Sequence, residues 1–130
     1  MKKLYFLLLA ILFAVNSRAQ WYPQNSGTVQ SLHSVFFTDA NTGYVVGGAG
    51  TILKTTNGGL DWVAQNSGTS KSLRSVHFPF DSLGFCVGDS GTILKTINGG
   101  IYWEPLTSGT AKNLSSVFLL FSLVFCLFLC

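Results

Sequence analysis

Apolar side chains recur at every second position in two short stretches of this chain, and turn residues follow each stretch. Val35 and Phe37 stand two residues apart, and Val76 and Phe78 repeat this spacing further along. β-Branched and aromatic residues at a period of two are typical of a strand with one buried face. The pattern therefore predicts a first strand near residues 32–37 and an equivalent one near residues 73–78.

Three further strands are expected after each of these. Residues 44–46 and 85–87 are apolar at every position, so both faces of these strands should be covered. Third strands are predicted at residues 51–55 and 92–96. Asn-Gly pairs follow them and are strong hairpin signals, each leading into a fourth strand that carries Trp62 or Trp103. No helical periodicity is present after residue 19.

The four-strand pattern belongs to an internal repeat with a period of 41 residues, seen in the spacing of Trp21, Trp62 and Trp103. Such units bury their apolar faces only by stacking on neighbours. Four short strands in a unit of this length match one propeller blade. We therefore expect an all-β fold, an incomplete β-propeller over residues 20–117, with repeats near 32–66 and 73–107 and a third begun at 114. A solenoid or a β-sandwich is the alternative.

The first 19 residues have the form of a secretory signal peptide. Lys2 and Lys3 precede an apolar run, and small residues stand at the positions that a signal peptidase reads. We expect cleavage before Gln20 and export to the periplasm, the cell surface or the medium. A retained membrane anchor is the alternative, although the run is shorter than the ~20 apolar residues that a span needs.

Residues 118–130 form a hydrophobic tail that lacks the turn signals of the repeat. Phe125 stands where the repeat has Gly43 and Gly84. As a helix, residues 117–130 would extend about 21 Å, short of a ~30 Å hydrocarbon core. A frameshift or truncation inside a longer propeller gene is favoured over a membrane-associating tail. Membrane contact is expected only through this tail, and self-association through the tail and the open faces of the blades.

The balance of positive and negative charges argues against nucleic acid as a partner. Removal of residues 1–19 takes away three of the eight Lys and Arg residues, leaving five cations against five anions. Nucleic-acid binding needs a positive patch for phosphates, which a balanced and scattered set does not supply. The remaining charged residues are Lys54, Lys71, Arg74, Lys95 and Lys112, and Asp39, Asp61, Asp81, Asp89 and Glu104.

Cysteine and histidine do not indicate a metal or redox site. The cysteines lack the paired spacing of a zinc site, and Cys86 stands where the first repeat has Val45, as a buried strand residue would. His33 and His77 occupy different positions of the repeat and do not form a repeated ligand pair. We expect no metal and no cofactor.

The hairpin segments of the two repeats resemble the Asp-box, or BNR, motif. Their chemistry is structural, because an Asn side chain caps turn amides, glycines adopt conformations that other residues avoid, and the indole packs against the hairpin base. We expect the two indoles to have the same surroundings. The motif residues are Thr55, Asn57, Gly58, Gly59 and Trp62, and Thr96, Asn98, Gly99, Gly100 and Trp103.

The wider repeat, from Asn-Ser-Gly-Thr through Gly-Thr-Ile-Leu-Lys-Thr to Asn-Gly-Gly and Trp, is similar to the propeller family of photosystem II stability and assembly factors and their bacterial relatives. In the photosynthetic members the resemblance implies a scaffold that binds a newly made membrane-protein subunit through a basic surface. Arg74 is the only arginine after residue 19 in this chain.

Two functions follow from these features. The first is a non-catalytic binding or scaffold module that contacts a protein or glycan partner through blade-edge loops, with Ser70, Lys71, Arg74, Asp89 and Ser90 as candidate residues. The alternative is a sialidase-like glycosidase fragment, because Asp-boxes also occur in sialidases. That chemistry needs an arginine cluster, which Arg74 alone cannot provide, so we expect no enzymatic activity.

Overall fold

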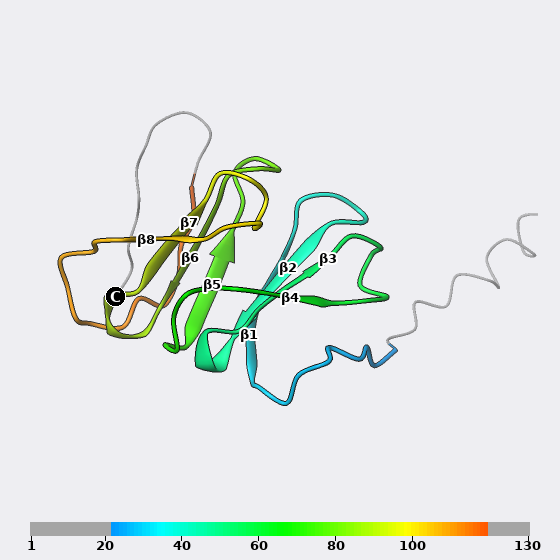
Figure 1. Ribbon diagram of the computed structural model, residues 1–130, viewed down its shortest axis with the longest axis horizontal. Coiled ribbons are helices and arrows are strands. Elements are labelled where there is room, and N and C mark those ends of the chain that lie inside the picture. The colour runs from blue at the N-terminus through cyan, green and yellow to red at the C-terminus, as the bar shows by residue number, and fades with distance from the viewer. Residues whose placement is uncertain (1–21, 120–130) are drawn as a thin grey trace, which may run out of the picture.

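The computed structural model describes residues 22–119, which form two four-stranded antiparallel sheets standing side by side (Figure 1). The predicted signal peptide and residues 120–130 of the predicted tail lie outside the described residues. The first sheet has the order β1 (Leu32–Phe37), β2 (Gly43–Gly47), β3 (Ile52–Thr55) and β4 (Val63–Gln65). The second has the order β5 (Leu73–His77), β6 (Gly84–Gly88), β7 (Ile93–Thr96) and β8 (Glu104–Leu106).

The limits of some strands differ from the prediction by one residue. The third strands begin after Thr51 and Thr92, because each threonine closes a single 3-10 turn, η1 (Gly48–Gly50) or η2 (Asp89–Gly91), by donating its backbone N–H to the first carbonyl of that turn. The fourth strands begin after Trp62 and Trp103, so the indoles belong to the turns rather than to the strands predicted to carry them.

The strand register assigns the side chains of each sheet to two faces. Directly paired residues of antiparallel strands share a face. We call the front face of the first sheet the one that carries the row Val35, Val45 and Leu53. The back face carries the row Ser34, Val46 and Ile52 and the row Phe36, Tyr44 and Lys54. The equivalent front row of the second sheet is Val76, Cys86 and Leu94, and its back row is Ser75, Val87 and Ile93.

The main core lies between the sheets, where the back face of the first sheet packs on the front face of the second. The Tyr44 ring stacks on Phe78 with 3.9 Å between ring centroids. Every residue of β2 is buried, as predicted for a strand covered on both faces. The core consists of Tyr44, Val46 and Ile52 from the first sheet and Leu73, Val76, Phe78, Cys86, Leu94 and Trp103 from the second.

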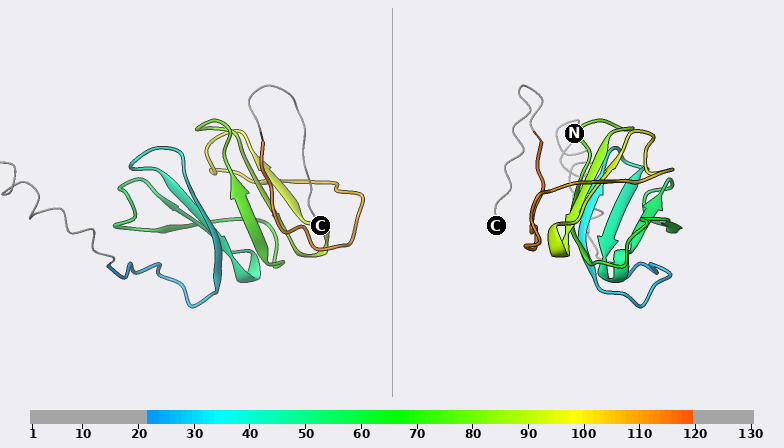
Figure 2. Two further views of the ribbon diagram at one scale, coloured as in Figure 1. Left: turned by 180° about the vertical axis from the view of Figure 1, so that it is seen from behind. Right: turned by 60° about the vertical axis from the view of Figure 1, so that its left-hand side comes forward.

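The segment after β8 continues the stacking on the back face of the second sheet (Figure 2). Val117 donates its backbone N–H to Ser75 Oγ at 3.2 Å, as Val76 donates to Ser34 Oγ at 3.3 Å one unit earlier. Leu114 and Val117 pack against Val87 and Ile93. These contacts continue the register of a third blade.

The third repeat, expected to begin at residue 114, does not start with a strand in the structure. The segment lies in the place of a first blade strand, but it has no strand pairing, because no strand among residues 22–119 forms a ladder with it.

Two four-stranded meanders stacked face to face, followed by the start of a third unit, make the fold an incomplete β-propeller.

Candidate functional site

The Asp-box residues of the first sheet form a closed hydrogen-bond network in the turn between β3 and β4. Thr55 Oγ1 accepts the backbone N–H groups of Asn57 at 3.3 Å and Gly59 at 2.9 Å, and it donates to Asn57 Oδ1 at 3.0 Å. Asn57 Oδ1 also accepts the N–H of Asp61 at 2.9 Å. The buried hydroxyl and the turn amides therefore satisfy one another inside the hairpin.

The second sheet repeats this network with nearly the same distances. Thr96 Oγ1 accepts from Asn98 N–H at 3.3 Å and Gly100 N–H at 3.0 Å, and Asn98 Oδ1 accepts from Tyr102 N–H at 3.0 Å. One bond differs, because Asn57 Nδ2 donates to the Asp61 carboxylate at 2.9 Å and a tyrosine occupies the equivalent position of the second repeat. The geometry of these residues is that of a structural turn.

The two glycines of each Asp-box turn have backbone conformations in the left-handed region. Their φ angles are 70° at Gly58 and 90° at Gly59, and 64° at Gly99 and 83° at Gly100. A side chain at these positions would be strained, so the Asn-Gly-Gly sequence has a direct conformational cause.

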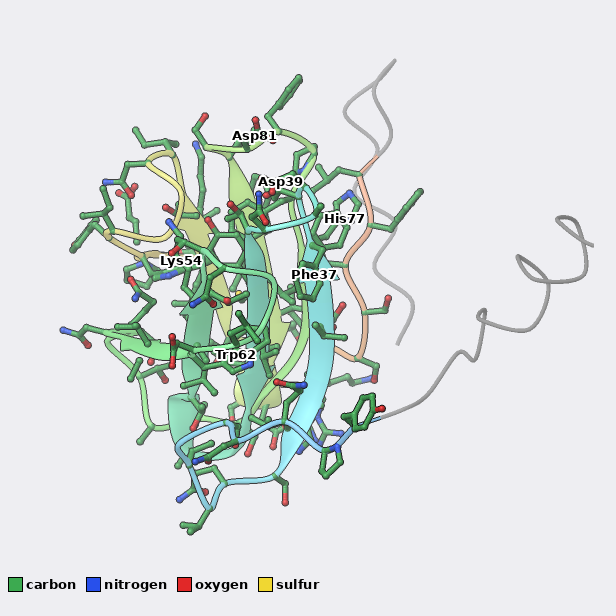
Figure 3. All side chains as sticks on the ribbon, turned by 90° about the vertical axis from the view of Figure 1, so that its right-hand side faces the viewer. Phe37, Asp39, Lys54, Trp62, His77 and Asp81 are labelled. Carbon is green, nitrogen blue, oxygen red and sulfur yellow. The ribbon has the colours of Figure 1, made fainter. Side chains whose placement is uncertain are left out.

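The two indoles have the same contacts within their own sheets. Trp62 meets Phe37 edge to face at 6.1 Å, and Trp103 meets Phe78 edge to face at 5.9 Å. Trp103 is buried, whereas Trp62 is half-buried. The expectation of identical surroundings is therefore wrong for burial, because the first sheet covers Trp103 and no described segment covers Trp62. Figure 3 looks onto this uncovered front face, where Phe37 and Trp62 lie together.

A contact between the sheets joins Tyr44 and Lys54 to the second Asp-box turn, and sequence reasoning missed it. The Tyr44 hydroxyl and Lys54 Nζ each donate to the Gly99 carbonyl oxygen at 2.8 Å, and Lys54 Nζ lies 5.4 Å from the centre of the Tyr44 ring. Burial raises the pKa of Tyr44, with smaller effects from the charges of Asp81 and Asp39. The signal in the sequence was Lys54, a cation in a short and otherwise uncharged strand.

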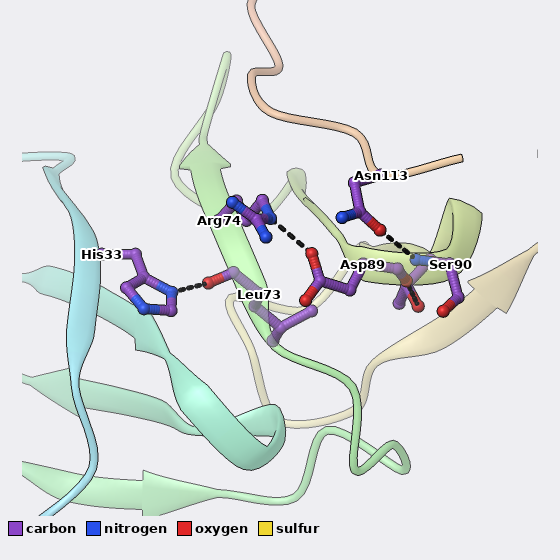
Figure 4. Close-up of polar contacts among 7 residues, drawn as sticks. His33, Leu73, Arg74, Asp89, Ser90 and Asn113 are labelled. Carbon is purple, nitrogen blue, oxygen red and sulfur yellow. Dashed lines mark hydrogen bonds and ion pairs between the residues drawn. The ribbon is translucent and has the colours of Figure 1, made fainter. Parts of the chain in front are cut away.

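The predicted partner-binding residues lie where the strands meet η1, η2 and the segments between repeats (Figure 4). Arg74 forms an ion pair with Asp89, and the hydrogen bond and charge of Asp89 raise the pKa of Arg74. The backbone N–H of Ser90 donates to Asn113 Oδ1 at 3.0 Å. Lys71 and Ser70 are exposed nearby, and Lys71 has no ion pair among residues 22–119. Arg74 is therefore paired with Asp89, whereas Lys71 forms no ion pair with any residue that the structure describes.

Because alternate strands run in opposite directions, most of the cations lie at one end of the sheets and most of the anions at the other. Three of the five described cations and one anion lie at the end of the sheets that contains η1 and η2; we call this the basic end, made of Lys71, Arg74, Asp89 and Lys112. The other end holds four anions and two cations. In Figure 3, Asp39 of the first sheet and Asp81 of the second are both seen beyond Lys54 at that end. These residues are Asp39, Asp61, Asp81, Glu104, Lys54 and Lys95.

The two histidines occupy separate places. His33 Nδ1 lies 2.8 Å from the Leu73 carbonyl oxygen, and His77 Nε2 lies 3.2 Å from the Leu119 carbonyl oxygen. Within residues 22–119 no group of three His, Cys, Asp or Glu side chains could hold a metal ion.

Three carboxylates of the described chain have local structural partners. Asp39 Oδ1 accepts the backbone N–H groups of Asn41 at 2.7 Å and Thr42 at 2.9 Å, and these bonds lower its pKa. Asp61 accepts from Asn57, and Asp89 pairs with Arg74. These contacts give the three carboxylates turn-capping and loop-pairing roles.

Cys86 lies in the core between the sheets. It is completely buried, and burial raises the pKa of its thiol well above the usual value. A thiol in this setting is a small packing residue, as its alignment with Val45 predicts.

No helix in the described part of the chain is long and apolar enough to cross a membrane.

Comparison with known proteins identifies the repeat. The solved structure "YCF48 bound to D1 peptide" matches with a TM-score of 0.59 and 24% identity, over 68% of this chain and 31% of that one. At this identity the match shows the fold alone, and the chain spans about a third of the length of that protein. No curated protein matches the chain. The family model of the photosynthesis system II assembly factor YCF48 matches residues 13–106. Since this match spans well over half of the sequence, the chain belongs to the YCF48 assembly factor family.

Proposed function

We propose that this chain is a non-catalytic, exported scaffold module that binds an extended segment of a protein partner. The observation that carries the proposal is its membership of the YCF48 family together with a solved structure of a fold relative bound to a D1 peptide. A rigid repeat scaffold with loops at the ends of its strands suits this function, because such loops carry binding residues while the sheets fix their positions.

The basic end is the surface that fits such a partner best. Lys71 and Lys112 stand at equivalent positions of successive repeats and are both exposed, so they present two charges of one sign along the row of blades. Arg74 adds a third cation whose charge Asp89 offsets. A segment with acidic side chains or a free carboxylate would meet complementary charge there.

Binding of a D1 peptide tests the proposal. The full chain is titrated into a fluorescently labelled D1 peptide, and fluorescence anisotropy is measured at low and moderate salt. We expect saturable binding that Lys71→Glu and Lys112→Glu weaken. Lys95→Glu is the matched control, because it makes the same charge change at the opposite end of the sheets. Absence of binding, or equal loss in the control, would contradict the proposal.

The proposal has two further parts: the chain is exported, and it derives from a longer propeller protein. The signal-peptide pattern of residues 1–19 supports export, and N-terminal sequencing of the protein recovered from the cell envelope or medium tests it. The coverage of only 31% of the solved relative supports derivation from a longer propeller. Further repeats in the coding DNA beyond residue 130, in any reading frame, would support that origin. Only residues 118–130 are proposed to contact a membrane.

A further inference from the structure

The Asn-Gly pairs of the two Asp-box turns are chemically reactive sequences. In such a pair the backbone nitrogen of the glycine can attack Cγ of the asparagine side chain, because glycine has no side chain of its own to hinder the approach. Asparagine is among the thermolabile residues of proteins. The chain has two Asn-Gly pairs, Asn57-Gly58 and Asn98-Gly99, at equivalent positions of the repeat.

The two glycine nitrogens have equivalent hydrogen bonds but differ in exposure. Gly58 N–H donates to the Asn41 carbonyl oxygen at 2.8 Å, and Gly99 N–H donates to the Ser82 carbonyl oxygen at 2.9 Å. Each bond must break before the nitrogen can lose its proton and attack. Gly58 is exposed, whereas Gly99 is buried. Solvent therefore reaches the first pair more readily than the second.

The neighbouring blade holds the second pair in place. The Gly99 carbonyl oxygen accepts hydrogen bonds from the Tyr44 hydroxyl and from Lys54 Nζ, both at 2.8 Å. Both donors belong to the first sheet, so opening of the second turn also breaks contacts between the sheets. The Gly58 carbonyl oxygen has no equivalent donor among residues 22–119. The first turn can therefore open alone, and local opening of this kind controls access to backbone amides.

One contact acts in the opposite direction and stabilises the first turn. Asn57 Nδ2 donates to the Asp61 carboxylate at 2.9 Å, and Asn98 lacks this partner because Tyr102 stands at the equivalent position. Both side chains of this bond are exposed, so water competes with it and its net contribution is small. The bonds to the Gly99 carbonyl include one from a buried tyrosine and outweigh it.

We propose that Asn57 is a site of spontaneous deamidation in the folded chain, and that the neighbouring blade protects Asn98 from the same reaction. The Gly58 nitrogen loses its proton to solvent base and bonds to Asn57 Cγ, and the Cγ–Nδ2 bond breaks to release ammonia. Water then adds to one of the two carbonyl groups of the cyclic imide and opens the ring. Attack at one carbonyl gives aspartate and attack at the other gives isoaspartate. The reaction is independent of partner binding at the basic end.

The aspartate product places a new charge beside Asp61. A carboxylate at residue 57 can still accept bonds from the Thr55 hydroxyl and the Asp61 N–H, but it cannot donate to the Asp61 carboxylate. Repulsion between two like charges replaces an attractive contact. The isoaspartate product adds a methylene group to the backbone of a turn whose two glycines have left-handed conformations. Both products should loosen the first Asp-box turn.

The deamidation rates of the two asparagines test the proposal. The full chain is incubated at mildly alkaline pH, folded or in guanidinium chloride, and peptide mapping by mass spectrometry follows aspartate and isoaspartate at each position. In the folded chain Asn57 should react at least about tenfold faster than Asn98, the factor for one additional net hydrogen bond that must break. In guanidinium chloride the two rates should be similar, because the sequences around both pairs are nearly the same.

A variant tests whether the blade contact is the source of the protection. Tyr44→Phe removes one of the two donors to the Gly99 carbonyl. It should increase the rate at Asn98 and leave the rate at Asn57 unchanged, so that Asn57 is the internal control. A folded-chain ratio no larger than that in guanidinium chloride, absence of reaction at Asn57, or an unchanged rate at Asn98 in Tyr44→Phe would each overturn the proposal.

A stability measurement tests the effect of the product. Asn57→Asp should lower the melting temperature at neutral pH, and the decrease should shrink at a pH low enough to protonate the carboxylates. Asn98→Asp is the matched control, because Tyr102 presents no like charge to the new carboxylate, and its effect should be smaller. Equal decreases in the two variants at neutral pH would contradict the repulsion between residue 57 and Asp61.

Discussion

The two sheets are near copies in sequence and turn chemistry, yet they differ in what covers them. The second sheet has the first sheet against its front face and residues 114–119 against its back face. Within residues 22–119, the first sheet packs against another sheet through its back face only. Leu32 is exposed while its equivalent Leu73 is fully buried. The same local sequence therefore yields a core residue in one copy and a surface residue in the other, because burial depends on the neighbouring blade.

The largest expected difference is at the aromatic positions of the two front faces. Phe78→Ala should lower the free energy of unfolding by about 3–5 kcal/mol, as for a phenylalanine deleted from a core. Phe37→Ala should cost about 1 kcal/mol, because the ring is already partly in water. Urea unfolding at low protein concentration measures both values. Equal costs would mean that the front face of the first sheet is covered in solution.

The Asp-box turns should behave alike in the two sheets. Thr55→Val and Thr96→Val each remove the acceptor of two backbone amides, and each should cost about 1–3 kcal/mol. The two costs should be similar because the network is internal to each hairpin. Thr56→Val is the control at an exposed neighbouring position. A cost confined to Thr96 would show that the turn depends on the contact between sheets.

The Tyr44 hydroxyl should contribute a smaller amount. Tyr44→Phe removes one of two donors to the Gly99 carbonyl and should lower the free energy of unfolding by about 1 kcal/mol. Tyr102→Phe removes an exposed hydroxyl and should leave stability unchanged. A Tyr44→Phe variant as stable as the parent would indicate that Lys54 alone satisfies the carbonyl.

The Asp39 carboxylate should give a small effect specific to the first sheet, visible at low pH. Backbone hydrogen bonds lower its pKa in the folded chain, so its contribution is complete above the unfolded pKa of about 4 and is lost as pH falls through the lower folded value. The difference in urea midpoint between the parent and Asp39→Asn should therefore shrink as pH falls below about 4. The second sheet closes its turn with the Leu83 N–H and Phe80 carbonyl instead. A difference that is constant with pH would exclude this capping role.

The ion pair at the basic end should have the smallest effect. Arg74→Ala removes an exposed pair with Asp89, and exposed pairs contribute little and are screened by salt. A slight decrease in melting temperature at low salt should disappear at high salt. A large decrease that persists at high salt would show that the Arg74 stem, rather than its charge, supports the loop.

The sequence by itself determined what each repeat does locally. Period-two alternation at Val35 and Phe37 predicted the strand, and the Thr-x-Asn-Gly-Gly pattern predicted the turn whose hydrogen bonds the structure displays. These features involve residues close in the chain, so the pattern of side chains contains the information needed. The repeat period also predicted the stacked arrangement, because an apolar face on each unit requires a neighbour.

Only the tertiary structure decided which copy of each face is buried and which residues connect the blades. Val35 and Val76 have the same local signal, and no pattern within a single repeat distinguishes them. The bond from Tyr44 to Gly99 spans 55 positions, and the charges gather at two ends only because alternate strands run in opposite directions. Such properties depend on the order in which blades stack, which is set by contacts between distant residues rather than by the residues near each position.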